Sequence, residues 1–183
     1  MSQRFHRFLN FPLQIKKPNE LGNKDEIDLF RGYFQELDPL DKFLKVNNLK
    51  ILYVDYLNTP AFSSLPIHSD FDNNLEEGVN INISFGGPNS GIRWYTYNDP
   101  KAEKIVYTTK TNIKYRQFEK KLCKEVYRTH TNNLSLVNVA PPHDTYNYHN
   151  FNRWTIRTGV AKKHSNTLLT WNEAIKIFSN YIL

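Results

Sequence analysis

Two residue types that can bind a metal stand close together in the segment PIHSD, where Asp70 follows His68 by two positions. In an extended chain, residues i and i+2 point to the same side, so this imidazole and this carboxylate can address one ion. Asp72 also lies nearby, but four positions along an extended chain is too far for easy chelation. A second histidine from a distant strand would complete a set of two histidines and one carboxylate, which leaves open positions on Fe(II). Three residues alone are a short pattern that also arises by chance.

A later segment, residues 134–159, holds the other side chains that such a site needs. A strand-like stretch leads to Pro142 and His143, and a further strand begins at Arg153, ten positions after the histidine (153 − 143). Arg153 and Thr155 share a face by the same period of two. A guanidinium offers a carboxylate a rigid fork of donors, and a neighbouring hydroxyl adds one more hydrogen bond. The segment therefore predicts a grip for a dicarboxylate close to the metal.

A shifted assignment of the same segment also fits. His149 precedes Arg157 by eight positions (157 − 149), so this pair could replace the first one. We prefer His143, because the Pro-His step leads directly from a clean strand. We prefer Arg153, because it has a hydroxyl two positions later, where Arg157 has Gly159. Both alternatives stay open at the level of sequence.

The elements that would position these residues are mostly strands. Residues 79–85 (VNINISF) alternate with a period of two, which is typical of a strand with one apolar and one polar face. The apolar face holds Val79, Ile81, Ile83 and Phe85, and the polar face holds Asn80, Asn82 and Ser84. Further short strand-like stretches separated by turn signals run from residue 49 to about residue 160, without βαβ alternation. We expect a mainly β fold of the α+β class, an antiparallel double-sheet jelly roll with flanking helices.

Helices are expected on both sides of this β core. Residues 23–37 carry an apolar stripe at a spacing of 3.6, which predicts a helix that Asp38-Pro39 ends. A second short helix is expected over 41–46, so the N-terminal helical region spans about 23–46. Ahead of it, residues 4–15 suit an edge strand or an entering arm.

The other end of the chain predicts an amphipathic helix over about 170–182. Thr170 and Glu173 are spaced as a capping box at its start. Residues 115–126, inside the β core, fit either a helix or a long-stranded excursion.

Composition limits the classes of protein to consider. The chain has 183 residues, which favours one domain over 1–183, and its only cysteine, Cys123, excludes an internal disulfide framework. The net charge of +6 permits a phosphate or nucleic-acid partner without requiring one. Phosphate-binding loops, a G-x-S-x-G elbow, a secretory signal and a long apolar run are all absent from the sequence. We expect a cytoplasmic protein without a membrane partner.

Taken in order, His68-x-Asp70, Pro142-His143 and Arg153-x-Thr155 resemble the motifs of the Fe(II)- and 2-oxoglutarate-dependent dioxygenases, whose fold is a double-stranded β-helix. More specifically, the chain is similar to the small, stand-alone oxygenase-like proteins encoded by bacteriophages. The resemblance covers roughly residues 49–160, which is most of the chain.

The resemblance implies roles for single residues. His68, Asp70 and His143 would be the metal ligands. Arg153 would bind the distal carboxylate of 2-oxoglutarate, and Thr155 stands where the family usually has a serine. That replacement keeps the hydroxyl group.

The resemblance also implies a reaction. Oxidative decarboxylation of 2-oxoglutarate to succinate and carbon dioxide would be coupled to oxidation of a substrate, usually to its hydroxylation. Asp70 argues against a halogenase, in which a small residue leaves room for halide. Tyr53 or Tyr56, and Asn82 on the polar face of its strand, are further candidates for contact with the co-substrate.

Two other functions stay in view. A catalytically silent jelly roll could serve as a binding or virion-type structural protein, because one fold carries many functions. A metal-dependent cupin that does not use 2-oxoglutarate would leave Arg153 with structural work. The main substrate cannot be read from the sequence. Residues 101–128 interleave basic and aromatic side chains that could stack on nucleic acid, but a solvated charged face is the preferred interpretation.

Overall fold

The computed structural model describes residues 4–13, 15, 26–28, 37–70, 78–108, 114–130 and 133–183, and these form two facing antiparallel sheets. The first sheet has the strand order β1 (His6–Phe8), β11 (Ser135–Asn138), β6 (Val79–Phe85), β13 (Arg153–Lys162), β3 (Leu49–Thr59) and β2 (Glu26–Asp28). The second sheet has the order β10 (Cys123–Thr129), β7 (Ser90–Tyr97), β12 (His143–Asn147), β5 (His68–Asp70), β9 (Lys114–Phe118) and β8 (Glu103–Thr108), and β4 (Ser63–Ser64) pairs with β12.

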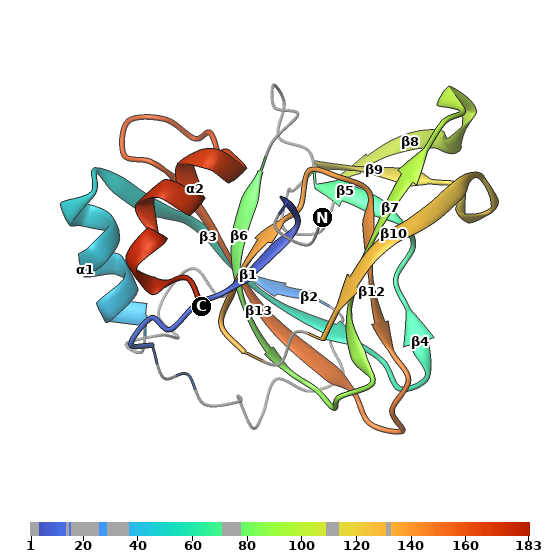
Figure 1. Ribbon diagram of the computed structural model, residues 1–183, viewed down its shortest axis with the longest axis horizontal. Helices are drawn as coiled ribbons and strands as arrows, with labels where there is room; N and C mark the ends of the chain where they lie inside the picture. The colour runs from blue at the N-terminus through green and yellow to red at the C-terminus, as the bar shows by residue number, and fades with distance from the viewer. Residues whose placement is uncertain are drawn as a thin grey trace.

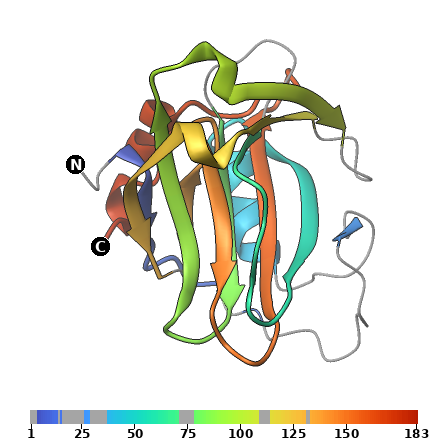
Figure 2. The ribbon, with the colours of Figure 1, turned by 90° about the vertical axis from the view of Figure 1, so that its right-hand side faces the viewer.

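The chain crosses repeatedly from one sheet to the other. It crosses at each step from β5 to β6 and β7, and again at each step from β10 through β11 and β12 to β13. Figure 1 shows the two curled sheets facing each other, and Figure 2 looks onto the second of them. This two-sheet arrangement is a jelly roll, and the predicted mainly β fold is confirmed.

Two helices cover the outer face of the first sheet (Figure 1). They are α1 (Asp38–Val46) and α2 (Trp171–Ile177), and a 3₁₀ turn, Ser179–Tyr181, follows α2. The predicted capping box is present, because Thr170 accepts a hydrogen bond from the Glu173 amide and Glu173 accepts one from the Thr170 amide. No helix in the described part of the chain is long and apolar enough to cross a membrane.

The N-terminal region differs from its prediction. Residues 26–28 form a strand that pairs with β3, so the helix expected over 23–37 is wrong at these positions. Of the rest of that range only Leu37 is described, and it is the N-cap of α1. Pairing with an open sheet edge overrides a helical pattern because it satisfies the edge strand's backbone groups. The second predicted helix exists and begins earlier, at Asp38, with Pro39 in its first turn. Proline is tolerated there because the first amides of a helix have no intrahelical partner.

Two open predictions are also decided by the strands. Residues 115–126 take the stranded alternative, as β9 and the start of β10 joined by a 3₁₀ turn at Lys120–Leu122. The N-terminal strand β1 is an edge strand, as expected, and pairs with β11.

Alternation in β6 and β13 separates an apolar face from a polar one. Val79, Ile81 and Ile83 pack in the core with α1 and α2, as the sequence pattern predicts. The opposite face of β6, together with Arg153, Thr155 and Arg157 of β13, is buried and polar. These side chains point between the two sheets. The interior of the sandwich is therefore polar at this place, which is the place where a site can form.

Candidate metal centre

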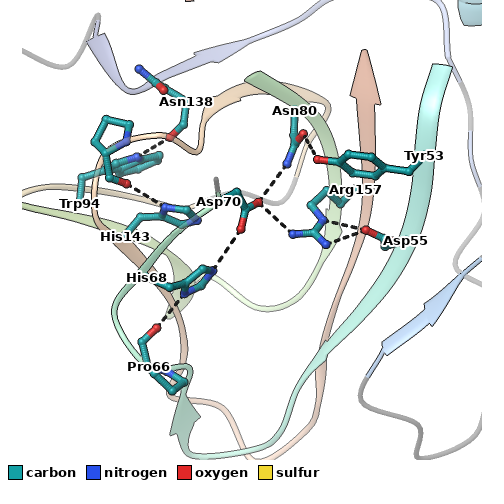
Figure 3. Close-up of polar contacts among 11 residues, drawn as sticks. Tyr53, Asp55, Pro66, His68, Asp70, Asn80, Trp94, Asn138, His143 and Arg157 are labelled. Atoms are coloured by element: carbon teal, nitrogen blue, oxygen red, sulfur yellow. Dashed lines mark hydrogen bonds and ion pairs between the residues drawn. The ribbon is translucent and has the colours of Figure 1, made fainter. Parts of the chain in front are cut away.

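Three potential metal ligands meet on neighbouring strands of the second sheet. His68 and Asp70 lie on β5, and His143 lies on β12 directly opposite His68 in the strand register. The two imidazole centroids are 4.5 Å apart, and Nε2 of His68 lies 3.8 Å from Oδ1 of Asp70. One ligand atom from each of the three residues lies within 4.8 Å of the others. Figure 3 shows the three side chains turned toward a common point.

Each histidine is oriented by a carbonyl two residues earlier in the chain. Nδ1 of His68 lies 2.8 Å from the Pro66 carbonyl oxygen, and Nδ1 of His143 lies 3.0 Å from that of Pro141. An Nδ1–H that donates to a carbonyl leaves the lone pair of a neutral imidazole on Nε2, which is the usual arrangement behind a metal-bound histidine. Both histidines follow a proline by two positions, and this Pro-x-His spacing is a sequence signal for these contacts that the predicted motifs did not include.

Burial and neighbouring charges set the protonation states of His143 and Asp70. It lowers the pKa of His143 to about 4, an effect that the nearby His68 reinforces, so His143 is neutral at physiological pH. Burial also opposes ionisation of Asp70, but the charge of Arg157 and the two histidines outweigh it and lower the pKa of that carboxyl. The group is thus two imidazoles and one carboxylate, a donor set that suits a divalent transition metal.

The predicted carboxylate grip faces the ligands from the first sheet. The Arg153 guanidinium is buried and donates to the Thr155 hydroxyl and, over 2.8 Å, to the Ser84 hydroxyl. Burial lowers the pKa of Arg153 to about 10, so it stays mostly charged at neutral pH. Arg153 and Thr155 line a small cavity of about 40 Å³ together with all three ligands.

Of the further co-substrate candidates, only Asn82 lines this cavity. Its side chain is buried, and its Oδ1 has no hydrogen-bond partner among the described residues. Tyr53 instead donates to Asn80 Oδ1 over 2.7 Å, and Tyr56 stacks on Trp154 with the ring centroids 4.5 Å apart. Neither tyrosine is among the described residues that line the cavity.

The alternative residues are engaged elsewhere. Nε2 of His149 accepts a hydrogen bond from the Asn89 amide over 3.0 Å, and its ring stacks on Phe151, so it is not in the ligand group. Arg157 already bridges two carboxylates, those of Asp55 and Asp70, and so has no fork to offer an incoming one. Asp72 lies outside the described residues.

A larger pocket of about 490 Å³ also borders the ligand group. His68, Asp70 and Arg157 form one wall, and the small cavity shares these residues and two leucines, Leu57 and Leu65. The Tyr115 ring stands edge-on to His68, with the centroids 5.8 Å apart, and also lines the pocket. His68 and Asp70 therefore border two chambers, the small cavity and the larger pocket, whereas His143 lines only the small cavity.

Two residues that contact the arginines of the site, Asp55 and Ser84, were not among the predicted site residues. Asp55 and Ser84 bind the two arginines, and Asp55 lies directly opposite Arg157 in the register of β3 and β13. The alternation of β6 already placed Ser84 on the same face as Asn82. Nothing local marks Asp55, because its partner is 102 residues away.

Within the segment 101–128, several basic side chains pair with acidic neighbours of the same segment. Glu119 holds Lys104 at 3.2 Å and Lys121 at 2.8 Å, and Arg128 pairs with Glu125. Phe118 is buried against Tyr97 rather than presented as a platform. These contacts fit the solvated-face interpretation, and a nucleic-acid partner stays a prediction.

Comparisons with known proteins give distant likenesses. No protein-family model matches the sequence, and no curated protein matches it. Among solved structures, EvdMO1 has a TM-score of 0.45 at 13% identity over 79% of this chain and 38% of its own. The non-heme monooxygenase ThoJ has a TM-score of 0.36 at 15% identity over 74% of this chain and 56% of its own. EvdO2 from Micromonospora carbonacea var. aurantiaca has a TM-score of 0.38 at 8% identity over 76% of this chain and 66% of its own.

The chain thus spans between 38% and 66% of the length of these three structures. At such identities and TM-scores the likeness carries no functional argument, so the function has to be argued from the site itself.

Proposed function

We propose that this protein is an Fe(II)- and 2-oxoglutarate-dependent dioxygenase that hydroxylates its substrate. One observation carries the proposal: His68, Asp70 and His143 converge on a common point, and a buried arginine faces them across a shared cavity. Two histidines and one carboxylate with open positions are the donor set of non-haem Fe(II) oxygenases.

The ligand group fits a single ion. Metal–ligand bonds of about 2.1 Å place neighbouring ligand atoms roughly 3–4 Å apart. The three ligand atoms lie within 4.8 Å of one another, so small side-chain rotations would close the set around an ion. Their Nδ1 contacts already aim Nε2 of both imidazoles inward.

Polar side chains that line the small cavity suit a dicarboxylate, but the cavity is too small to hold one as it stands. Arg153 supplies a cation, Thr155 a hydroxyl, and Asn82 a side-chain amide whose NH2 group can donate to a carboxylate. The cavity of about 40 Å³ has room for only a few water molecules. Binding of 2-oxoglutarate therefore requires Leu57 and Leu65, which both chambers share, to move apart.

The residues of this chain have separable tasks in the proposed reaction. His68, Asp70 and His143 would hold iron, which when bound supplies the redox chemistry that couples oxygen to oxidation of the substrate. Arg153 would neutralise and orient the distal carboxylate, assisted by Thr155. The substrate would reach the ligand group from the pocket of about 490 Å³, on the side of His68 and Asp70.

One observation favours a second candidate, a metal-dependent cupin that does not use 2-oxoglutarate. The Arg153 guanidinium already donates to Thr155 and Ser84, which is what a purely structural arginine would do. In that case the arginine would hold β6 against β13, and the metal would act without a dicarboxylate.

Anaerobic titration with Fe(II) and 2-oxoglutarate tests the proposal, because a metal-bound 2-oxoacid gives a visible charge-transfer band. We expect the band in the wild type, its loss in His68→Ala and His143→Ala, and its retention in His149→Ala. Arg153→Ala should weaken 2-oxoglutarate binding far more than Fe(II) binding. Fe(II) binding without a band in the wild type would favour the cupin alternative, and equal loss of both ligands in Arg153→Ala would count against the carboxylate grip.

A further inference from the structure

We propose that Arg157 is a positioning residue of the metal centre, which fixes the Asp70 carboxylate so that only Oδ1 can reach the ion. The inference rests on the metal site proposed above. It concerns a residue of the first sheet that acts on a ligand of the second. Figure 3 shows the chain of contacts from Asp55 through Arg157 to Asp70.

The two oxygens of Asp70 have different surroundings. Oδ2 accepts a hydrogen bond from Nη1 of Arg157 over 2.9 Å and lies 3.5 Å from Nδ2 of Asn80. Oδ1 points to the other side, 3.8 Å from Nε2 of His68. A carboxylate held in this way offers a metal one oxygen, because rotating it to offer both would break the bond to the guanidinium.

Arg157 is itself fixed from behind. Its Nε and Nη2 both donate to Oδ2 of Asp55, over 3.0 Å and 2.6 Å. The Tyr53 ring lies 5.5 Å from the guanidinium carbon, and Tyr53 holds Asn80 through its hydroxyl. All three charged side chains are nearly inaccessible to solvent, with exposed fractions of 7% for Arg157, 1% for Asp55 and 5% for Asp70. A planar fork between two carboxylates is a rigid strut, which a lysine cannot reproduce.

The charges of this array favour a cation at its open end. Arg157 alone would neutralise Asp70, but Asp55 offsets the guanidinium, so that the three side chains together keep a charge of −1. The array therefore directs Asp70 without cancelling its attraction for a divalent ion. Residues that bind a metal ligand from behind commonly change metal affinity when they are replaced.

The way in which Asp70 binds determines how many coordination positions stay open on the metal. Two imidazoles and one carboxylate oxygen occupy three positions of an octahedral ion, and three stay open. If both oxygens of Asp70 were bound, only two positions would be left, which is too few for a chelating 2-oxoacid and a further small ligand. The proposed role of Arg157 is thus to keep the second oxygen of Asp70 off the metal, so that three coordination positions stay open instead of two.

Co(II) alone serves as the probe, because its visible spectrum reports coordination number and does not depend on turnover. Removing only Arg157 would leave two buried carboxylates without a counter-charge, which threatens folding. The double variant Arg157→Gln/Asp55→Asn removes one positive and one negative charge and so keeps the net charge of the array. Arg157→Lys is the second test variant, since it keeps the cation and loses the fork. The matched control is the double variant Arg93→Gln/Asp144→Asn, which likewise removes one positive and one negative charge from a buried pair, and neither residue is among those that line the two cavities.

We expect the wild type and Arg93→Gln/Asp144→Asn to bind one Co(II) with the same dissociation constant and the same spectrum. The Arg157→Gln/Asp55→Asn variant should bind Co(II) about 10–100-fold more weakly, with a changed visible spectrum, and Arg157→Lys should change in the same direction. Wild-type affinity and spectrum in a folded Arg157→Gln/Asp55→Asn variant, or in Arg157→Lys, would overturn the inference. Failure of the wild type to bind Co(II), or wild-type binding by His143→Ala, would instead remove the proposed metal site.

Discussion

Two buried histidines of this chain, His143 and His6, have different surroundings and therefore different roles. His143 is neutral because it is buried beside His68, and its Nε2 faces the ligand group. His6 is also buried, at 4% exposure, but it packs edge-on against Phe8, and its Nε2 has no hydrogen-bond partner among the described residues. Burial lowers the pKa of His6 to about 4, with a further contribution from Arg7.

His6 should therefore make stability depend on pH. Its ordinary pKa is 6.5, so as the pH falls the unfolded chain takes up the proton before the folded protein does. Its contribution to the free energy of unfolding is fully present above pH 6.5 and is lost progressively as the pH falls toward 4. His6→Phe should flatten the decline between pH 6.5 and 4 in urea unfolding with a chelator present, and part of the decline should persist because His143 titrates in the same range.

His164 provides the control, because it is exposed and His164→Phe should leave the pH dependence of unfolding unchanged. A decline in His6→Phe as steep as in the wild type would show that His6 gains its proton as easily in the folded protein as in the unfolded chain.

At the scale of elements, β13 carries most of the polar interior. Arg153, Thr155 and Arg157 are every second residue of the strand and so lie on one face of it. Gly159 is the next residue on that face, and the Tyr53 ring lies against it. A Cβ at Gly159 would lie 2.4 Å from a ring carbon of Tyr53, which is closer than side chains tolerate. The glycine thus allows Tyr53 to lie over Arg157.

Gly159→Ala should displace the Tyr53 ring and lower the free energy of unfolding by about 1–3 kcal/mol, the usual cost of overpacking a buried site. Urea denaturation measures the loss. Gly78→Ala is the matched control, because its Cβ would meet only side-chain ends, Cδ1 of Leu168 at 3.3 Å and Cγ2 of Val139 at 3.6 Å. Equal stability of the two variants would mean that the contact between Gly159 and Tyr53 does not constrain β13.

Local pattern predicted much of this arrangement. The alternation of residues 79–85 predicted which side chains of β6 face the helices and which face the site, because a strand has a period of two. The Thr170 and Glu173 capping box predicted the start of α2 for a similarly local reason. The strand at 26–28 could not be foreseen, because it depends on the free edge of β3. The link between Arg157 and Asp55 depends on the register of strands about 100 residues apart, which no local pattern specifies.

On the scale of the whole molecule, the site joins the two sheets. All three ligands belong to the second sheet, through β5 and β12, whereas Arg153, Thr155 and Asn82 belong to the first, through β13 and β6. Within the described residues at the site, the Arg157 bond to Asp70 is a direct ion pair between the sheets. A metal alone would link strands of one sheet, while a metal-bound dicarboxylate held by Arg153 would span both.

Crystals grown anaerobically with Mn(II) and 2-oxoglutarate test this arrangement most directly, through the anomalous signal of the metal. The account predicts one metal peak at about 2.1 Å from Nε2 of His68, Nε2 of His143 and one oxygen of Asp70. It also predicts a dicarboxylate that reaches from the metal to the Arg153 guanidinium. A metal peak away from these three side chains, or a bound metal without a dicarboxylate at the Arg153 guanidinium, would contradict it.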